Sequence, residues 1–289
     1  MKKLTYMVAG AAIAAAFGLG TGATAEAQGS DPSEDCAVCH EEIAADFQTT
    51  VHAIKERGGP SCVTCHGHGE RHMEEGGDAS LIGKPEGADG EMLCLSCHGN
   101  TRTMFSKNSV HSGAAVTCIS CHNVHASGAS QPKMLEDAAN ELCASCHPSP
   151  AGSFEKAFGH KLDRGGLQCV SCHNPHGGRG RHSLKVDRSG EIACLSCHAE
   201  KRGPFVYPHV TGMTGDCLSC HEPHGSVNPM SLTRARVAHL CLECHSPIEG
   251  GTLGSQPPSI HDLRSPRYQN CTTCHVKIHG SNTSPLLTR

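Results

Sequence analysis

The chain has 289 residues, a formal net charge of −4 and 37% hydrophobic residues, but no Trp, three Tyr and six Phe. With so few large apolar side chains a conventional core is not expected, and the 20 Cys, 23 His and 33 Gly indicate that cofactors fill the interior. The acidic balance disfavours a nucleic-acid partner, which would need a basic surface.

The N-terminal stretch has the composition of a secretory signal peptide. Two lysines precede an apolar run from Met7 to Leu19, and small residues follow up to Ala27. The run is short and interrupted by glycines, which disfavours a transmembrane helix. We expect residues 1–27 to be removed, leaving one domain over 28–289 without a segment that could span a bilayer.

All 20 cysteines lie in ten CxxCH motifs spread along the chain. In order, the cysteines are Cys36 and Cys39, Cys62 and Cys65, Cys94 and Cys97, Cys118 and Cys121, Cys143 and Cys146, Cys169 and Cys172, Cys194 and Cys197, Cys217 and Cys220, Cys241 and Cys244, and Cys271 and Cys274. The adjoining histidines are His40, His66, His98, His122, His147, His173, His198, His221, His245 and His275. Two thiols at this spacing can add to both vinyl groups of one porphyrin, and the adjoining His becomes the proximal iron ligand. We therefore predict ten covalently bound haem c groups.

Three other uses of CxxC motifs fit this pattern less well. Zinc ribbons do not require a His after each second Cys. A disulfide framework suits an exported protein but leaves these histidines unexplained. Thioredoxin-like redox pairs occur once or twice in a strand–helix setting, not ten times in Gly-rich loops. Haem attachment accounts for every residue of the motif.

Most of the thirteen remaining histidines flank the even-numbered motifs. Five precede the first Cys of motifs two, four, six, eight and ten by seven to ten residues: His52, His111, His160, His209 and His261. Four follow the proximal His of motifs four, six, eight and ten by three or four residues: His125, His176, His224 and His279. At motif two either His68 or His72 would complete the set. His182 and His239 are surplus.

Ten additional histidines for ten irons favour bis-histidine ligation, organised as five two-haem repeats of about 50 residues. The methionines outside the signal stretch occupy no repeated position, so we do not expect Met ligands. Because an axial Met raises the reduction potential relative to His, ten bis-histidine haems imply low potentials. Two strong ligands on each iron leave no site for a substrate, which argues against an enzyme.

The predicted fold is mostly irregular, with short α-helices at the motifs and almost no β structure. No alternating run of β-branched residues is longer than a few positions. Asp137 resembles an N-cap ahead of motif five. Five Phe lie shortly before the upstream histidines and are expected to pack on porphyrin faces: Phe47, Phe105, Phe154, Phe158 and Phe205.

The later motifs carry a family resemblance. The segments CHNVHA, CHNPHG, CHAEKRGPFVYPH, GDCLSCHEPHGSVNP and NCTTCHVKIHGSN resemble the decahaem cytochromes of the MtrA/DmsE family, and the similarity covers essentially all of 28–289. The resemblance implies a haem wire with two His ligands at each iron. Relatives with a similar CHGPGxxH arrangement favour His72 over His68.

The resemblance also implies a place in the cell and a set of partners. Such a protein would be periplasmic and associated with the outer membrane, where it would enter a β-barrel porin. It would receive electrons from an inner-membrane quinol-oxidising cytochrome and pass them to an extracellular multihaem cytochrome or reductase. An anionic surface suits a polar barrel lumen. The alternatives are a soluble periplasmic shuttle and, less favoured, a nitrite- or hydroxylamine-type enzyme, because the chain has no CxxCK motif.

Overall fold

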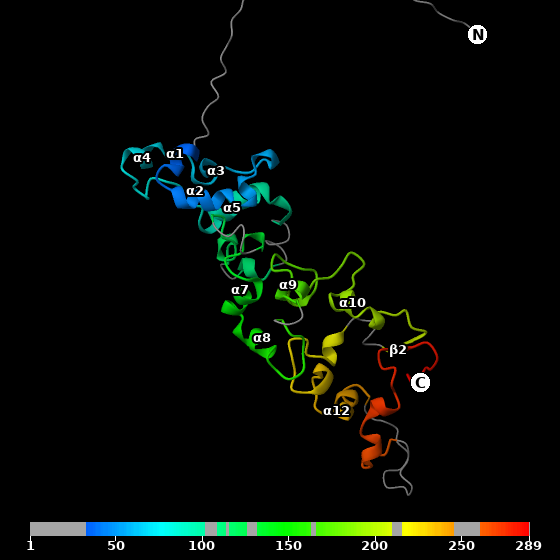
Figure 1. The fold of residues 1–289 in the computed structure, drawn as a ribbon. Coiled ribbons are helices and arrows are strands. Elements are labelled where there is room, and N and C mark those ends of the chain that lie inside the picture. The colour runs from blue at the N-terminus through cyan, green and yellow to red at the C-terminus, as the bar shows by residue number, and fades with distance from the viewer. Residues whose placement is uncertain are drawn as a thin grey trace, which may run out of the picture.

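A computed structural model describes residues 33–101, 109–113, 116–125, 132–162, 166–209, 216–245 and 261–288. These residues form an elongated row of short elements rather than a layered domain (Figure 1). At one end lie α1 (Ser33–Ala37), α2 (Glu41–Gln48), α3 (Cys62–His66), α4 (Glu70–Glu74) and α5 (Gly87–Cys97). Then follow α7 (Ala139–Cys146), α8 (Pro148–Ser153), α9 (Cys169–Cys172) and α10 (Cys194–Cys197), and α12 (Val237–Leu242) lies toward the other end.

Single 3-10 turns make up much of the remaining regular structure. Three of them carry CxxCH motifs: Cys118–Ser120, Cys217–Ser219 and Cys271–Thr273. The others are Val51–Ala53, Lys55–Arg57, His111–Gly113, Pro132–Met134, Arg181–Ser183, Ala199–Lys201, Pro229–Ser231 and Pro266–Tyr268. The predicted fold class, mostly irregular with short helices, is confirmed.

Each CxxCH motif lies on a short helical turn, and local capping explains several of these turns. Ser61 precedes α3 and forms a capping box with Thr64, while Thr117 does the same with Ser120 ahead of motif four. The predicted cap at motif five is wrong. Helix α7 begins after Ala138, and Asp137 instead accepts a hydrogen bond from the Ala138 N–H at 2.7 Å.

A two-stranded sheet among the described residues joins the segment before motif eight to the C-terminal part of the chain. Strands β1 (Tyr207–Pro208) and β2 (Gly280–Ser281) are antiparallel, with Tyr207 opposite Ser281 and Pro208 opposite Gly280. The Val206 N–H also donates to Asn282 Oδ1 at 3.0 Å. This contact places His279, the histidine downstream of motif ten, close to motif eight.

The described residues have almost no hydrophobic core. The buried apolar side chains among them are Met134, Ala139 and Ala238. No large side chain of the described residues is fully buried. No helix within these ranges has the length and apolar character needed to cross a membrane. The predicted signal stretch 1–27 and Phe105 lie outside the described residues. Because so few apolar side chains are buried, the described residues agree with the composition-based expectation that the chain has no conventional core.

Gly280 tests the contact between the two strands. Its φ is +140°, and a Cβ there would lie 2.2 Å from Phe205 Cδ2. We expect Gly280→Ala to destabilise the protein by about 1–3 kcal/mol through overpacking, measured by denaturant unfolding. Gly152→Ala is the matched control, because Gly152 lies in α8 with nothing within 4 Å of a Cβ. Equal unfolding midpoints for the two variants would contradict this assignment.

Candidate functional site

Nine of the ten motif histidines face the ring of a second histidine from another part of the chain. The pairs are His40 with His72, His98 with His52, His66 with His125, His147 with His111, His122 with His176, His198 with His160, His173 with His224, His245 with His209, and His221 with His279. The ring centroids lie between 5.8 Å and 6.3 Å apart. Two metal–nitrogen bonds of about 2 Å each, together with the two half-rings, span this separation. Each pair can therefore hold one ion between its rings.

The pairs follow one rule along the chain. The His of an odd motif faces the histidine upstream of the preceding even motif, as His98 faces His52. The His of an even motif faces the histidine downstream of the next even motif, as His66 faces His125. Motif one is the exception, because His40 faces His72 beyond motif two. Counting histidines in the sequence could find these residues but could not assign their partners.

The structure also separates the ambiguous histidines. His72 and not His68 faces His40; the His68 side chain is exposed and lies 3.9 Å from Glu70. His182 and His239 are exposed as well. His275 of motif ten has no facing ring within the described part of the chain, and His261, its predicted companion, is exposed at the start of segment 261–288.

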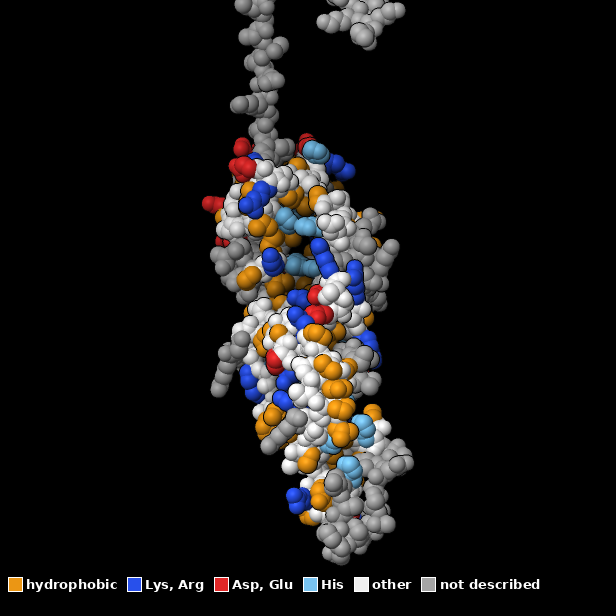
Figure 2. All heavy atoms as spheres, turned by 90° about the vertical axis from the view of Figure 1, so that its right-hand side faces the viewer, with side chains coloured by type: hydrophobic (Ala, Val, Ile, Leu, Met, Phe, Trp, Pro, Cys, Tyr) orange, Lys and Arg blue, Asp and Glu red, His pale blue; other side chains and the backbone are white. Residues whose placement is uncertain are grey.

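Burial favours the neutral form of six of the paired rings. It is the main cause that lowers the pKa of His52, His125, His176, His209, His224 and His279. The facing histidine lowers the pKa of His52 and His125 further. Neutral imidazole is the form that binds a metal ion, so the environment prepares these rings as ligands. On the face shown in Figure 2, histidine side chains border hollows in the surface.

The five even-motif histidines share a second contact that the sequence did not reveal. Each has Nδ1 within hydrogen-bond distance of a backbone carbonyl oxygen: His66 with Gly83 (2.7 Å), His122 with Lys133 (3.0 Å), His173 with His182 (2.9 Å), His221 with Met230 (2.9 Å) and His275 with Leu286 (2.6 Å). A carbonyl can only accept, so Nδ1 carries the proton and Nε2 is left for a metal. His182 thus contributes its backbone rather than its ring.

The cysteines place the ten motifs in one unbroken row. The first Cys of each odd motif lies beside the first Cys of the next motif: Cys36 and Cys62, Cys94 and Cys118, Cys143 and Cys169, Cys194 and Cys217, and Cys241 and Cys271. The second Cys of each even motif up to motif eight lies near the second Cys of the following one: Cys65 and Cys97, Cys121 and Cys146, Cys172 and Cys197, and Cys220 and Cys244. Burial and the neighbouring Cys271 thiol, for example, raise the pKa of Cys241 to about 12. Neighbours in sequence are therefore neighbours in space.

The donor set suits haem better than the alternatives. A disulfide framework would use the cysteines but would leave the adjoining histidines and their facing rings without a role. Within the described ranges, no three His, Cys, Asp or Glu side chains converge as a tetrahedral zinc site would require. Two imidazoles on opposite sides of a gap, next to two thiols three positions apart, fit a covalently attached porphyrin with an axial ligand on each face.

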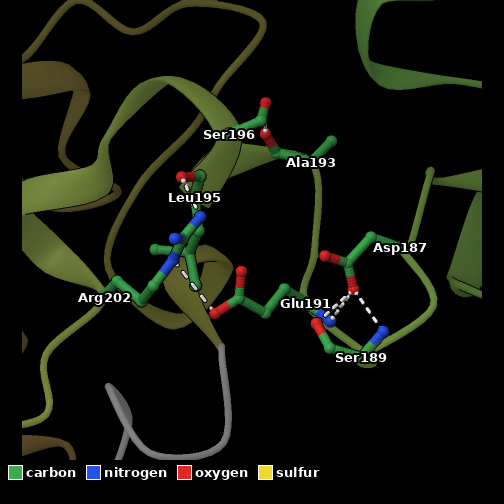
Figure 3. Close-up of polar contacts among 7 residues, drawn as sticks. All are labelled: Asp187, Ser189, Glu191, Ala193, Leu195, Ser196 and Arg202. Carbon is green, nitrogen blue, oxygen red and sulfur yellow. Dashed lines mark hydrogen bonds and ion pairs between the residues drawn. The ribbon is translucent and has the colours of Figure 1, made fainter.

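A polar hairpin braces motif seven (Figure 3). Asp187 Oδ1 accepts hydrogen bonds from the N–H groups of Ser189 and Glu191 at 2.8 and 2.9 Å. The Glu191 carboxylate pairs with Arg202 at 3.0 Å, and the same guanidinium donates to the carbonyl oxygen of Leu195 within the motif at 3.1 Å. These contacts fix α10, which carries the motif cysteines.

The sequence also predicted that Phe side chains pack beside the histidines, on the porphyrin faces. Phe154 packs against the His224 ring with centroids 5.2 Å apart. Phe205 lies against Gly280, while Phe158 is 40% exposed and exchanges backbone hydrogen bonds with Ser226. Of these three, Phe154 alone lies against one of the paired rings.

The chain matches a family model described as a doubled CXXCH motif over residues 111–152, 160–203 and 209–250. Each matched unit begins at the upstream histidine of an even motif and continues past the following odd motif. Each unit therefore contains one complete ring pair, such as His111 with His147. Motifs one, two, three and ten lie outside the matched units.

Individual relatives extend this match. The chain is 35% identical over 269 residues to the multiheme cytochrome MtrA of Shewanella baltica, covering 86% of this chain and 78% of the relative. It is 26% identical over 172 residues to the cytochrome c-type protein NrfB of Haemophilus influenzae, covering 60% of this chain and 67% of that protein. A third relative, NrfB of Escherichia coli, is 27% identical over 128 residues, covering 39% of this chain and 67% of that protein. With its repeated haem-attachment motifs and its similarity to MtrA along most of both chains, the protein belongs to the MtrA family of multihaem c-type cytochromes, and is an electron-transfer protein rather than an enzyme.

Proposed function

We propose that the protein carries ten haems, one on each CxxCH motif, and conducts electrons along them in sequence order. The observation that carries this proposal is the unbroken row of neighbouring cysteines from motif one to motif ten. Electron transfer requires short steps between successive cofactors, and the row supplies a near neighbour for every motif. Each haem iron would contribute a one-electron couple, while the chain sets the spacing and the axial ligands.

The proposed axial ligands follow the nine ring pairs. Each motif histidine would bind the iron from one face and its facing histidine from the other. For motif ten, His275 and His261 would form the tenth pair, because His261 is the upstream histidine that no other motif uses. The haem domain would comprise residues 28–289, with residues 1–27 removed on export.

Mass and spin state test the number of haems and their ligation. Intact-mass measurement of the purified protein should give the polypeptide plus ten haem masses. Electron paramagnetic resonance of the oxidised protein should show low-spin iron, because two imidazoles complete each coordination sphere. A bare polypeptide, zinc in place of iron, or a stoichiometric high-spin signal would contradict the proposal, and the last result would favour an enzyme.

His209 tests one axial pair directly, because its ring faces His245 at 6.2 Å. We expect His209→Met to raise the potential of the motif-nine haem, by part of the roughly 0.8 V range that axial ligands span. The haem should remain bound, since its two thioether bonds are unchanged. His239→Met is the control, because His239 is exposed on α12. Ten unchanged potentials in the His209 variant would show that His209 is not a ligand.

We further propose that the protein acts in the periplasm at the outer membrane, as a conduit held in a β-barrel porin. It would connect an inner-membrane quinol-oxidising cytochrome to an extracellular multihaem cytochrome or reductase. Family membership supports this role, and so does the elongated row of elements in Figure 1, whose two distant ends could serve as electron entry and exit. A soluble shuttle would use the same haems but would have no barrel partner.

Purification from membranes separates the conduit from the shuttle. We expect the tagged protein to co-purify with a β-barrel protein from gently solubilised outer membranes, in near-equal amounts. The same tag on an unrelated periplasmic protein controls for carry-over. Recovery of the whole pool as a monomer from washed periplasm would favour the shuttle.

A further inference from the structure

Three turns that follow motifs four, six and eight share an unusual backbone conformation. We call them the clamp turns: residues 132–135, 181–184 and 229–232. Each contains two consecutive non-glycine residues with positive φ: Lys133 (67°) and Met134 (57°), His182 (53°) and Ser183 (55°), and Met230 (59°) and Ser231 (53°). Residues other than Gly, Asn and Asp avoid this left-handed region, and turns that need it twice usually contain Asn-Gly. The same strained backbone conformation therefore occurs in all three turns, each time at residues that disfavour it.

Each clamp turn makes the same set of hydrogen bonds to its motif. The first left-handed residue offers its carbonyl oxygen to Nδ1 of the motif histidine, as Met230 does to His221 at 2.9 Å. The second accepts from the N–H of the residue after that histidine: Met134 from Asn123 (2.8 Å), Ser183 from Asn174 (2.8 Å) and Ser231 from Glu222 (2.7 Å). A short antiparallel bridge then joins the histidine to Leu135, Leu184 or Leu232.

The clamp turns act through the backbone and not through their side chains. The first left-handed residue is Lys, His or Met in the three turns, and these share no chemistry. The Met230 side chain is 79% exposed. A negative φ at this position would turn the chain away from the bridge and remove the carbonyl from Nδ1. Persistent backbone strain of this kind marks a constraint that the surrounding structure maintains for function.

We propose that the clamp turns lower the reduction potentials of the haems on motifs four, six and eight, with Lys133, His182 and Met230 as positioning residues. A carbonyl that accepts the Nδ1 proton fixes the tautomer and orientation of the ring and makes Nε2 a more basic ligand. A more basic ligand stabilises the oxidised iron and so lowers its potential. This inference rests on the haem ligation proposed above.

A pair of substitutions at residue 230 isolates the backbone effect. Met230→Pro fixes φ near −65° and forbids the left-handed conformation, whereas Met230→Gly permits it without strain. Both remove the same side chain, and among the hydrogen bonds of the described residues none uses the Met230 N–H as donor. We expect redox titration of Met230→Pro to show one haem at a higher potential, with ten haems retained. Met230→Gly should titrate like the wild type.

The outcomes distinguish this inference from the proposed function. Ten unchanged potentials in a fully loaded, low-spin Met230→Pro protein would overturn the role of the clamp turns and leave the ligation intact. A high-spin signal in the wild-type protein would overturn the ligation itself. Lys133→Pro and Lys133→Gly repeat the comparison at motif four, so a folding failure at residue 230 does not end the test. The proline variant there is again expected to raise one potential, and its failure to do so contradicts the inference.

Discussion

The whole structure depends on one geometric constraint. Two imidazole rings from distant parts of the chain must face each other at a distance that leaves room for one metal ion bound to both. The described residues contain almost no apolar core, so hydrophobic burial cannot hold these segments together. In the proposed ligation, axial bonds from the facing histidines would supply these long-range contacts. Because a site of this kind does not exist in the unfolded chain, cofactor binding and folding are coupled, and each additional bis-histidine iron would stabilise the native arrangement.

The order of the ring pairs turns these separate contacts into one assembly. Odd motifs five, seven and nine are paired inside their own doubled-CXXCH units, as in His160 with His198, whereas even motifs four and six reach into the next unit, as in His173 with His224. Each unit is therefore linked to the next part of the chain by a facing ring pair, and the strands β1 and β2 lie next to the last of these pairs, His221 with His279. Such a solenoid-like chain has nearest-neighbour interactions throughout, which suits both its elongated form and electron transfer in single steps.

The sequence was most informative where chemistry requires a particular side chain. The CxxCH spacing predicted the short helical turns, and the composition predicted the lack of a large core. The histidine count predicted all the facing rings except the choice at motif two, where only the family resemblance favoured His72 over His68. The sequence did not predict contacts made by the backbone. The residue types at Lys133, His182 and Met230 do not indicate that their carbonyl oxygens accept hydrogen bonds from Nδ1 of the motif histidines. Asp137 shows the related limit of capping rules, since its carboxylate bonds the adjacent N–H and the helix begins one residue later than an Asp137 cap would place it. Partner assignment also needed the structure, because ligands separated by tens of residues obey no local periodicity.

The two classes of motif therefore differ in how the chain holds them, although they share one sequence pattern. After four of the odd motifs the chain continues directly into another helical element: α2 after His40, the helical residues 99–101 after His98, α8 after His147 and the turn Ala199–Lys201 after His198. After an even motif it folds back and places a carbonyl on Nδ1. A chain of identical CxxCH motifs can thus present alternating environments to its cofactors without changing a single ligand. Successive sites of a haem wire must stay close to one another in both distance and reduction potential. With the proposed ligands, backbone geometry would therefore allow the potentials to be adjusted while the ligand set and the fold stay constant.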